Sequence, residues 1–109
     1  MYNSDAFWLT QWNLNTLWAL AYPSVLDDFA ACLLQYDTNG GLLPRGPCAG
    51  GYSYIMTGCP ATSLITAAYQ KELTRKWQPV KAYHPIKINH AKGGMLGLDM
   101  DKELAFYIQ

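Results

Sequence analysis

The stretch SVLDDFAACLLQYDTNGG, residues 24–41, decides the fold class because it carries the clearest helical pattern in the chain. Its apolar residues recur at intervals of three and four, as on one face of an α-helix. They are Val25, Phe29, Cys32, Leu33 and Tyr36. Ser24 and Asp27 resemble a capping box, and Asn39, Gly40 and Gly41 supply a left-handed terminator. We therefore predict a helix over 24–38.

The segment before it predicts a second helix over 5–22. The sequence DAFWLTQWNLNTLWALAY contains neither Gly nor Pro, and Ser4 or Asn3 can cap it. Only a short Tyr-Pro-Ser connection separates the two helices, so they are expected to form an antiparallel hairpin.

The rest of the chain alternates helical patterns with loops. Helices are expected over 60–76, 79–90 and 100–109, separated by Gly-rich loops over 40–58 and 91–98. Pro85 should kink or end the helix over 79–90 after about one turn. The predicted fold is all-α, with helical hairpins and long Gly-rich loops in one partial domain over 1–109.

Composition excludes several classes of function. The formal net charge is zero, and 15% of residues are charged where about 25% is usual. A balanced chain of this kind is not expected to bind nucleic acid or an acidic membrane surface. There is no signal-peptide pattern at the N-terminus and no apolar run of the roughly 18 residues that span a bilayer.

Carboxylates are scarce where a site is expected. Glycoside hydrolysis uses two facing carboxyl groups, but the chain has only two Glu and six Asp, and none lies in the loop over 40–58. Asp27 and Asp28 are interpreted as solvated helix positions. Catalytic residues therefore stay unknown, and no metal ligands or phosphate loop are predicted.

Cysteine and histidine give weak signals. Cys32 is interpreted as a buried thiol, and a disulfide between Cys48 and Cys59 is left open. His90, beside Gly93 and Gly94, is the better candidate of the two histidines. A polar loop histidine that contacts the backbone is the favoured interpretation.

Neutral polar groups beside aromatic rings form the most distinctive chemistry. Trp8 and Gln11 lie on the first predicted helix, and Arg45 and Tyr52 lie in the loop over 40–58. Sugar rings stack on aromatic faces while their hydroxyls bond to amides and guanidinium groups. The same aromatics could instead belong to the core or interface of a helical assembly, and composition leaves both alternatives open.

Three long strings carry a resemblance to a known family. They are FWLTQWNLNTLWALAYP (7–23), NGGLLPRGPCAGGYSYIMTGCPATSLITAAY (39–69) and NHAKGGMLG (89–97). In this order and spacing the sequence resembles glycoside hydrolase family 92, the calcium-dependent exo-acting α-mannosidases, over nearly the whole chain. The resemblance implies a fragment of the family's (α/α)6 toroid.

The resemblance also implies an activity. The parent enzyme would remove terminal α-linked mannose by inverting hydrolysis, with calcium contacting sugar hydroxyls and with the Glu acid and Asp base on segments C-terminal to this one. Trp8, Gln11, Arg45 and Tyr52 would contact the substrate, a mannose-containing glycan. The isolated chain would be inactive, and the parent would be secreted or periplasmic.

Two departures from the family pattern concern the sugar. Leu9 follows Trp8, and Cys59 ends the loop, where many members carry Asp. These changes imply a different sugar or linkage, or weaker binding. The alternatives to a fragment are a small helical carbohydrate-binding module and a helical protein-interaction domain. As a fragment, the chain would pair with the remainder of its parent domain or self-associate through exposed apolar faces.

Overall fold

The computed structural model describes residues 7–45 and 58–94. Over these ranges the chain is helical and contains no β-strand, which confirms the all-α prediction. The elements are α1 (Phe7–Thr10), α2 (Leu14–Ala21), α3 (Pro23–Gly40), α4 (Pro60–Gln70) and α5 (Pro79–Asn89). The predictions for 100–109, and for most of the loops over 40–58 and 91–98, lie outside the described residues.

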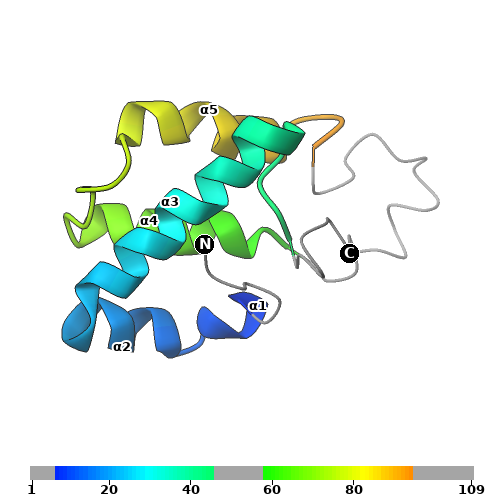
Figure 1. Cartoon of the computed structure of the whole chain (residues 1–109). Coiled ribbons are helices and arrows are strands. Elements are labelled where there is room, and N and C mark those ends of the chain that lie inside the picture. Colours follow the sequence, from blue (N-terminus) through cyan, green and yellow to red (C-terminus); the bar gives the residue numbers. More distant parts are fainter. Residues whose placement is uncertain (1–6, 46–57, 95–109) are drawn as a thin grey trace.

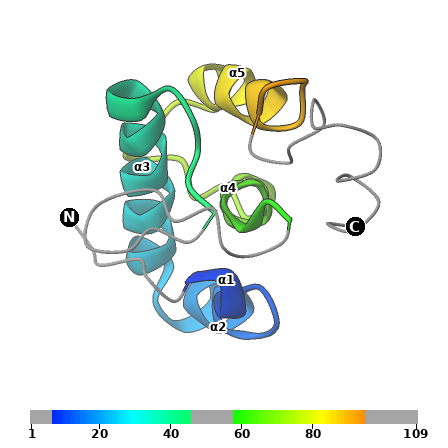
Figure 2. The same cartoon turned by 90° about the vertical axis from the view of Figure 1, so that its right-hand side faces the viewer.

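Helix α4 is the centre of the described fold. It contacts α1, α2, α3 and α5, and Figures 1 and 2 show these helices around it. Its buried residues meet an apolar face of α3, because both helices repeat apolar residues every three or four positions. The core residues of these two helices are Leu26, Phe29, Ala30, Leu33, Ala61, Leu64, Ile65 and Ala68.

Two helices occupy the range predicted as one helix over 5–22. Helix α1 ends at Thr10, and a turn over 11–13 separates it from α2. The Thr10 hydroxyl donates to the Phe7 carbonyl at 2.7 Å. Asn13 is the N-cap residue of α2 and has an irregular backbone conformation. The Thr10 hydroxyl thus competes with a helical hydrogen bond, whereas the Asn13 side chain makes no capping hydrogen bond.

Helix α3 differs from the prediction at its start. It begins at Pro23, and neither Ser24 nor any other side chain caps it, so the predicted capping box is wrong. Asp27 is buried, 3% exposed, which contradicts its interpretation as a solvated position. The end agrees with the prediction, since Gly41 adopts φ 83° and its amide donates to the Asp37 carbonyl at 2.7 Å.

Helix α4 is shorter than the predicted span of 60–76. Glu72 adopts φ 59°, and its amide donates to the Tyr69 carbonyl while the Leu73 amide donates to the Ala68 carbonyl. These two bonds form a Schellman motif, which usually has glycine at the left-handed position. Because glutamate stands there, the sequence showed no stop signal.

Helix α5 passes through Pro85, so the predicted stop after one turn is wrong. Proline removes one helical hydrogen bond and crowds the preceding turn. Here the Pro85 ring is buried and lines a groove beside α3, so that packing offsets the backbone cost.

Candidate functional site

One end of the molecule brings together the segments whose strings resemble the family. Figure 2 looks onto this end, where the start of α4 lies next to α1, and the chain that follows α3 approaches both α4 and the end of α5. The described parts are residues 41–45, 58–62 and 89–94. We call these residues the loop end.

Asn89 joins two distant segments at the loop end. Its side-chain amide donates to the Leu43 carbonyl at 3.0 Å, and its carbonyl oxygen accepts the Leu43 amide at 3.0 Å. Asn89 and Leu43 are both fully buried. The pair fixes the backbone just before Arg45, because a buried peptide group held on both sides cannot exchange its partners for water.

A second contact joins α4 to the end of α5. The Thr62 hydroxyl and Nε2 of His90 are 3.2 Å apart, and which of them donates depends on the imidazole tautomer. His90 was predicted to contact backbone, whereas the structure gives it this hydroxyl partner. The imidazole is therefore held over the first turn of α4.

Backbone conformation and close packing explain why glycine occupies positions 93 and 94, after His90. Gly93 adopts φ 81°, a conformation that favours glycine. A Cβ on Gly94 would collide with the carbonyl oxygens of Ile88 and Asn89. The close return of the chain at Gly94 thus depends on both glycines.

Arg45 lies close enough to Cys59 to act on it electrostatically. Burial raises the pKa of the Cys59 thiol, and the positive charge of Arg45 opposes that rise. Cys59 is a free thiol just before α4, and Cys48, its possible disulfide partner, lies outside the described residues. Cys32 is also free and is half-buried rather than fully buried.

The predicted sugar-contact residues occupy different places. Half-buried Trp8 lies on α1, which packs against α4, and exposed Gln11 lies in the turn after α1. Arg45 is at the loop end beside Cys59, and Tyr52 lies outside the described residues. The structure thus puts Arg45 and the helix carrying Trp8 against the same central helix.

Asn89 and Thr62 were missed as functional candidates by the sequence analysis. The NHAKGG string contains Asn89, but nothing in the sequence shows that its side chain meets Leu43, 46 positions earlier. Thr62 stands in a region without charged residues and looks like an ordinary helix position. The packing of α5 against the chain after α3 reveals the first contact, and its packing against α4 reveals the second.

The loop end has no carboxylate. The one acidic residue in the sequence between positions 38 and 98 is Glu72, which follows the far end of α4 by two residues. Calcium is normally held by several carboxylate and carbonyl oxygens. The described residues of the loop end do not fit such a site, and no cluster of three His, Cys, Asp or Glu occurs in 7–45 and 58–94. No described helix is both long and apolar enough to cross a bilayer.

Comparison with protein families gives the class. The model of the glycosyl hydrolase family 92 catalytic domain matches residues 1–107. Because the match covers almost the whole sequence, the chain belongs to glycosyl hydrolase family 92. Comparison with curated proteins and comparison with solved structures each gave no match.

Proposed function

We propose that this chain is a segment of a family 92 catalytic domain that removes terminal α-linked mannose from glycans by inverting hydrolysis. Its α-helices would form antiparallel hairpins within an (α/α)6 toroid, and its loop end would line the sugar pocket. The parent enzyme would act outside the cytoplasm, as a secreted or periplasmic protein.

The observation that supports this role is the double hydrogen bond between Asn89 and Leu43. It holds the chain after α3 against the last residue of α5, 46 positions away, in a fixed relation beside Arg45. A sugar site needs polar groups held in fixed positions, because each freely moving side chain costs binding free energy when it is ordered.

The acid and the base of the reaction would come from the rest of the parent domain. An inverting glycosidase places its two carboxyl groups roughly 6.5–9.5 Å apart around the substrate. The loop end offers a guanidinium, an imidazole and the Thr62 hydroxyl, which can bind sugar hydroxyls but cannot form that pair. Calcium, which would contact sugar hydroxyls, would likewise be bound by residues outside the described loop end.

The first test is an Arg45→Ala substitution in the full parent domain. A charge-assisted hydrogen bond contributes about 1.5–3 kcal/mol, so we expect kcat/KM for an aryl α-mannoside to fall by roughly 10- to 100-fold. Lys71→Ala, at the opposite end of α4, is the matched control and should leave kcat/KM unchanged.

The isolated 109-residue chain should not hydrolyse the aryl α-mannoside. Turnover by this chain that disappears when one of its own acidic residues is replaced would refute the fragment assignment. Titration of the same chain with mannose separates the alternative, since millimolar or tighter binding that is lost in Trp8→Ala would indicate a free-standing carbohydrate-binding module.

A further inference from the structure

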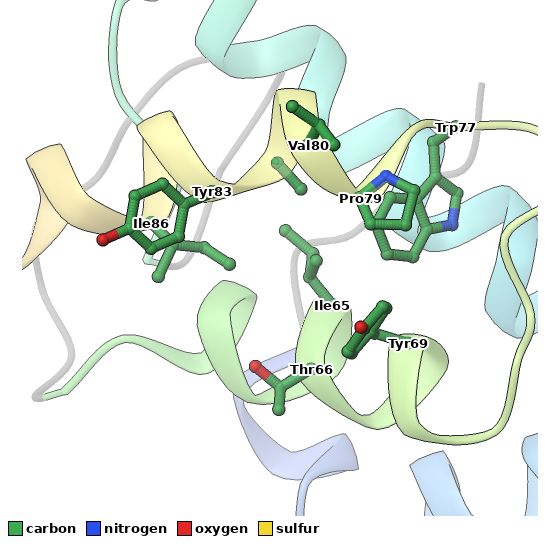
Figure 3. A pocket seen from close by; sticks show the side chains of 9 residues that line it. Ile65, Thr66, Tyr69, Trp77, Pro79, Val80, Tyr83 and Ile86 are labelled. Carbon is green, nitrogen blue, oxygen red and sulfur yellow. The ribbon is translucent and has the colours of Figure 1, made fainter.

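Two cavities border α5, and they differ in chemistry. The groove between α4 and α5 is lined by apolar and aromatic side chains, among them Tyr69, Val80 and Tyr83 (Figure 3). The cavity between α3 and α5 has a volume of about 310 Å³ and a largely polar lining, and we call it the α3–α5 pocket. Pockets that bind small molecules have volumes of about 300 Å³ or more. The polar residues of the α3–α5 pocket are Gln35, Asp37, Thr38, Lys76, Gln78 and Lys81.

The α3 wall of this pocket presents hydrogen-bond acceptors. The side-chain amide of Gln35 donates to the Asn39 side chain at 3.2 Å, and the Thr38 hydroxyl donates to the Leu34 carbonyl at 3.2 Å. Each of these two residues therefore has its side-chain oxygen left over as an acceptor, and its position is fixed by the bond that it donates. Asp37 lies between them in the sequence and adds a carboxylate.

Asp37 has no partner for that carboxylate. Among residues 7–45 and 58–94 it makes no side-chain hydrogen bond and no ion pair. Partial burial raises the pKa of Asp37, and the positive charge of His84 opposes that rise. A carboxylate that has lost part of its hydration without gaining donors is stabilised by a ligand that supplies them.

The α5 wall presents a donor of opposite charge. Lys81 lines the pocket but forms no ion pair with Asp37 or with any other residue that the structure describes. Lys76 is paired with Asp28 instead. The pocket therefore carries one unpaired charge of each sign, so it disfavours a simple anion as well as a simple cation.

Apolar side chains complete the lining. Leu34, Trp77 and Pro85 border the same pocket, and the indole N–H of Trp77 is occupied by the Leu73 carbonyl. Such a surface suits the C–H face of a sugar ring. Sugar hydroxyls can both donate to a carboxylate such as Asp37 and accept from an ammonium group such as Lys81.

We propose that the α3–α5 pocket is a second carbohydrate site, which binds a neutral sugar through Asp37, Lys81 and the apolar surface between them. It is separate from the loop end, because none of its lining residues lies in 41–45, 58–62 or 89–94. It requires hydroxyl groups beside a C–H face and not mannose in particular, so it does not rest on the proposed hydrolysis. A zwitterion such as glycine carries both charges but no C–H face, and it should bind more weakly.

Titration of the full, isotope-labelled chain, followed by two-dimensional NMR, tests the proposal. The probes are methyl α-mannoside and methyl α-glucoside, with glycine as the zwitterionic comparison. At least one glycoside should shift the backbone amide signals of residues 35–38 and of Gln78 and Lys81. The signals of 41–45 and 89–94 report separately on binding at the loop end.

Substitutions in the two walls of the pocket make the test specific. Asp37→Asn and Lys81→Met should each raise the dissociation constant of the glycoside roughly 5- to 10-fold, because each removes a charged hydrogen-bonding group. Lys87→Met is the matched control, since Lys87 is exposed on α5 but does not line the pocket, and it should leave the constant unchanged. Arg45→Ala, at the loop end, should also leave it unchanged. Circular dichroism verifies that each variant is folded.

Three results would overturn the proposal. They are the absence of glycoside-induced shifts at residues 35–38 and 78–81, equal dissociation constants for Lys81→Met and Lys87→Met, and tighter binding of glycine than of either glycoside. The last would assign the pocket to a zwitterionic ligand. None of these outcomes depends on whether the parent enzyme hydrolyses mannosides, so failure of that function would leave this test unaffected.

Discussion

Asn89 shows how much one buried amide can determine. It satisfies both the amide and the carbonyl of Leu43, so its side chain takes the place that a neighbouring strand or helix would otherwise fill. Arg45 follows Leu43 by two residues, and its approach to Cys59 therefore depends on Asn89.

Asn89→Ala should lower the free energy of unfolding by about 2–4 kcal/mol, because it leaves two buried backbone groups without partners. Chemical denaturation of the full chain measures the loss. Asn39→Ala is the control, since Asn39 is exposed and accepts only from Gln35 on the same helix, and it should cost less than about 0.5 kcal/mol. Equal losses in the two variants would contradict the role given to Asn89.

At the scale of elements, the connection between α4 and α5 depends on Trp77. This side chain is 7% exposed and joins the core, and its indole N–H donates to the Leu73 carbonyl at 3.1 Å. Lys76 adds an ion pair with Asp28 and a long bond, 3.5 Å, from its amide to Asp27. The connection over 71–78 is thus attached to α3 as well as to its own helices.

Trp77→Ala should destabilise the fold by about 3–5 kcal/mol, as expected when a large buried aromatic residue is removed. Tyr69 and Trp77 both line an apolar groove between α4 and α5, but Tyr69 is 58% exposed, so Tyr69→Ala should cost under about 1 kcal/mol. Thermal unfolding followed by circular dichroism compares the two. A Tyr69 loss as large as the Trp77 loss would show that the groove is closed more tightly than the structure indicates.

At the scale of the whole molecule, α2 presents apolar residues on its outer face. Leu17 and Leu20 are 52% and 74% exposed, although the inner face of the same helix packs against α3 and α4. A helix with apolar residues on both faces is typical of one that lies between two layers. This agrees with a role inside a larger helical domain.

The isolated chain should therefore self-associate through α2. Changing both Leu17 and Leu20 to Gln should raise the dimer dissociation constant at least about tenfold, because apolar area is lost from the contact. Sedimentation velocity over a concentration series measures this, with Thr38→Gln at an exposed position of α3 as the control. A wild-type chain that stays monomeric at every concentration would argue against an apolar interface on α2.

The sequence by itself determined the helical class, the end of α3 and the family. These depend on local signals: the apolar spacing over 24–38, the Gly40–Gly41 terminator and the three long strings. A local signal does not depend on how the helices pack. Local signals failed where packing outweighed them. Pro85 stays inside α5 because its ring is buried, and Glu72 ends α4 in a conformation usually left to glycine.

Only the tertiary structure decided which residues meet. The contacts of Asn89 with Leu43 and of Thr62 with His90 join positions 46 and 28 residues apart, and no local pattern encodes such distances. The burial of Asp27 could not be predicted from the sequence either, because Asp28 stands in the same local sequence and is more exposed. The physical reason is that helical spacing fixes which face is apolar, whereas the partner of each face depends on how the helices pack.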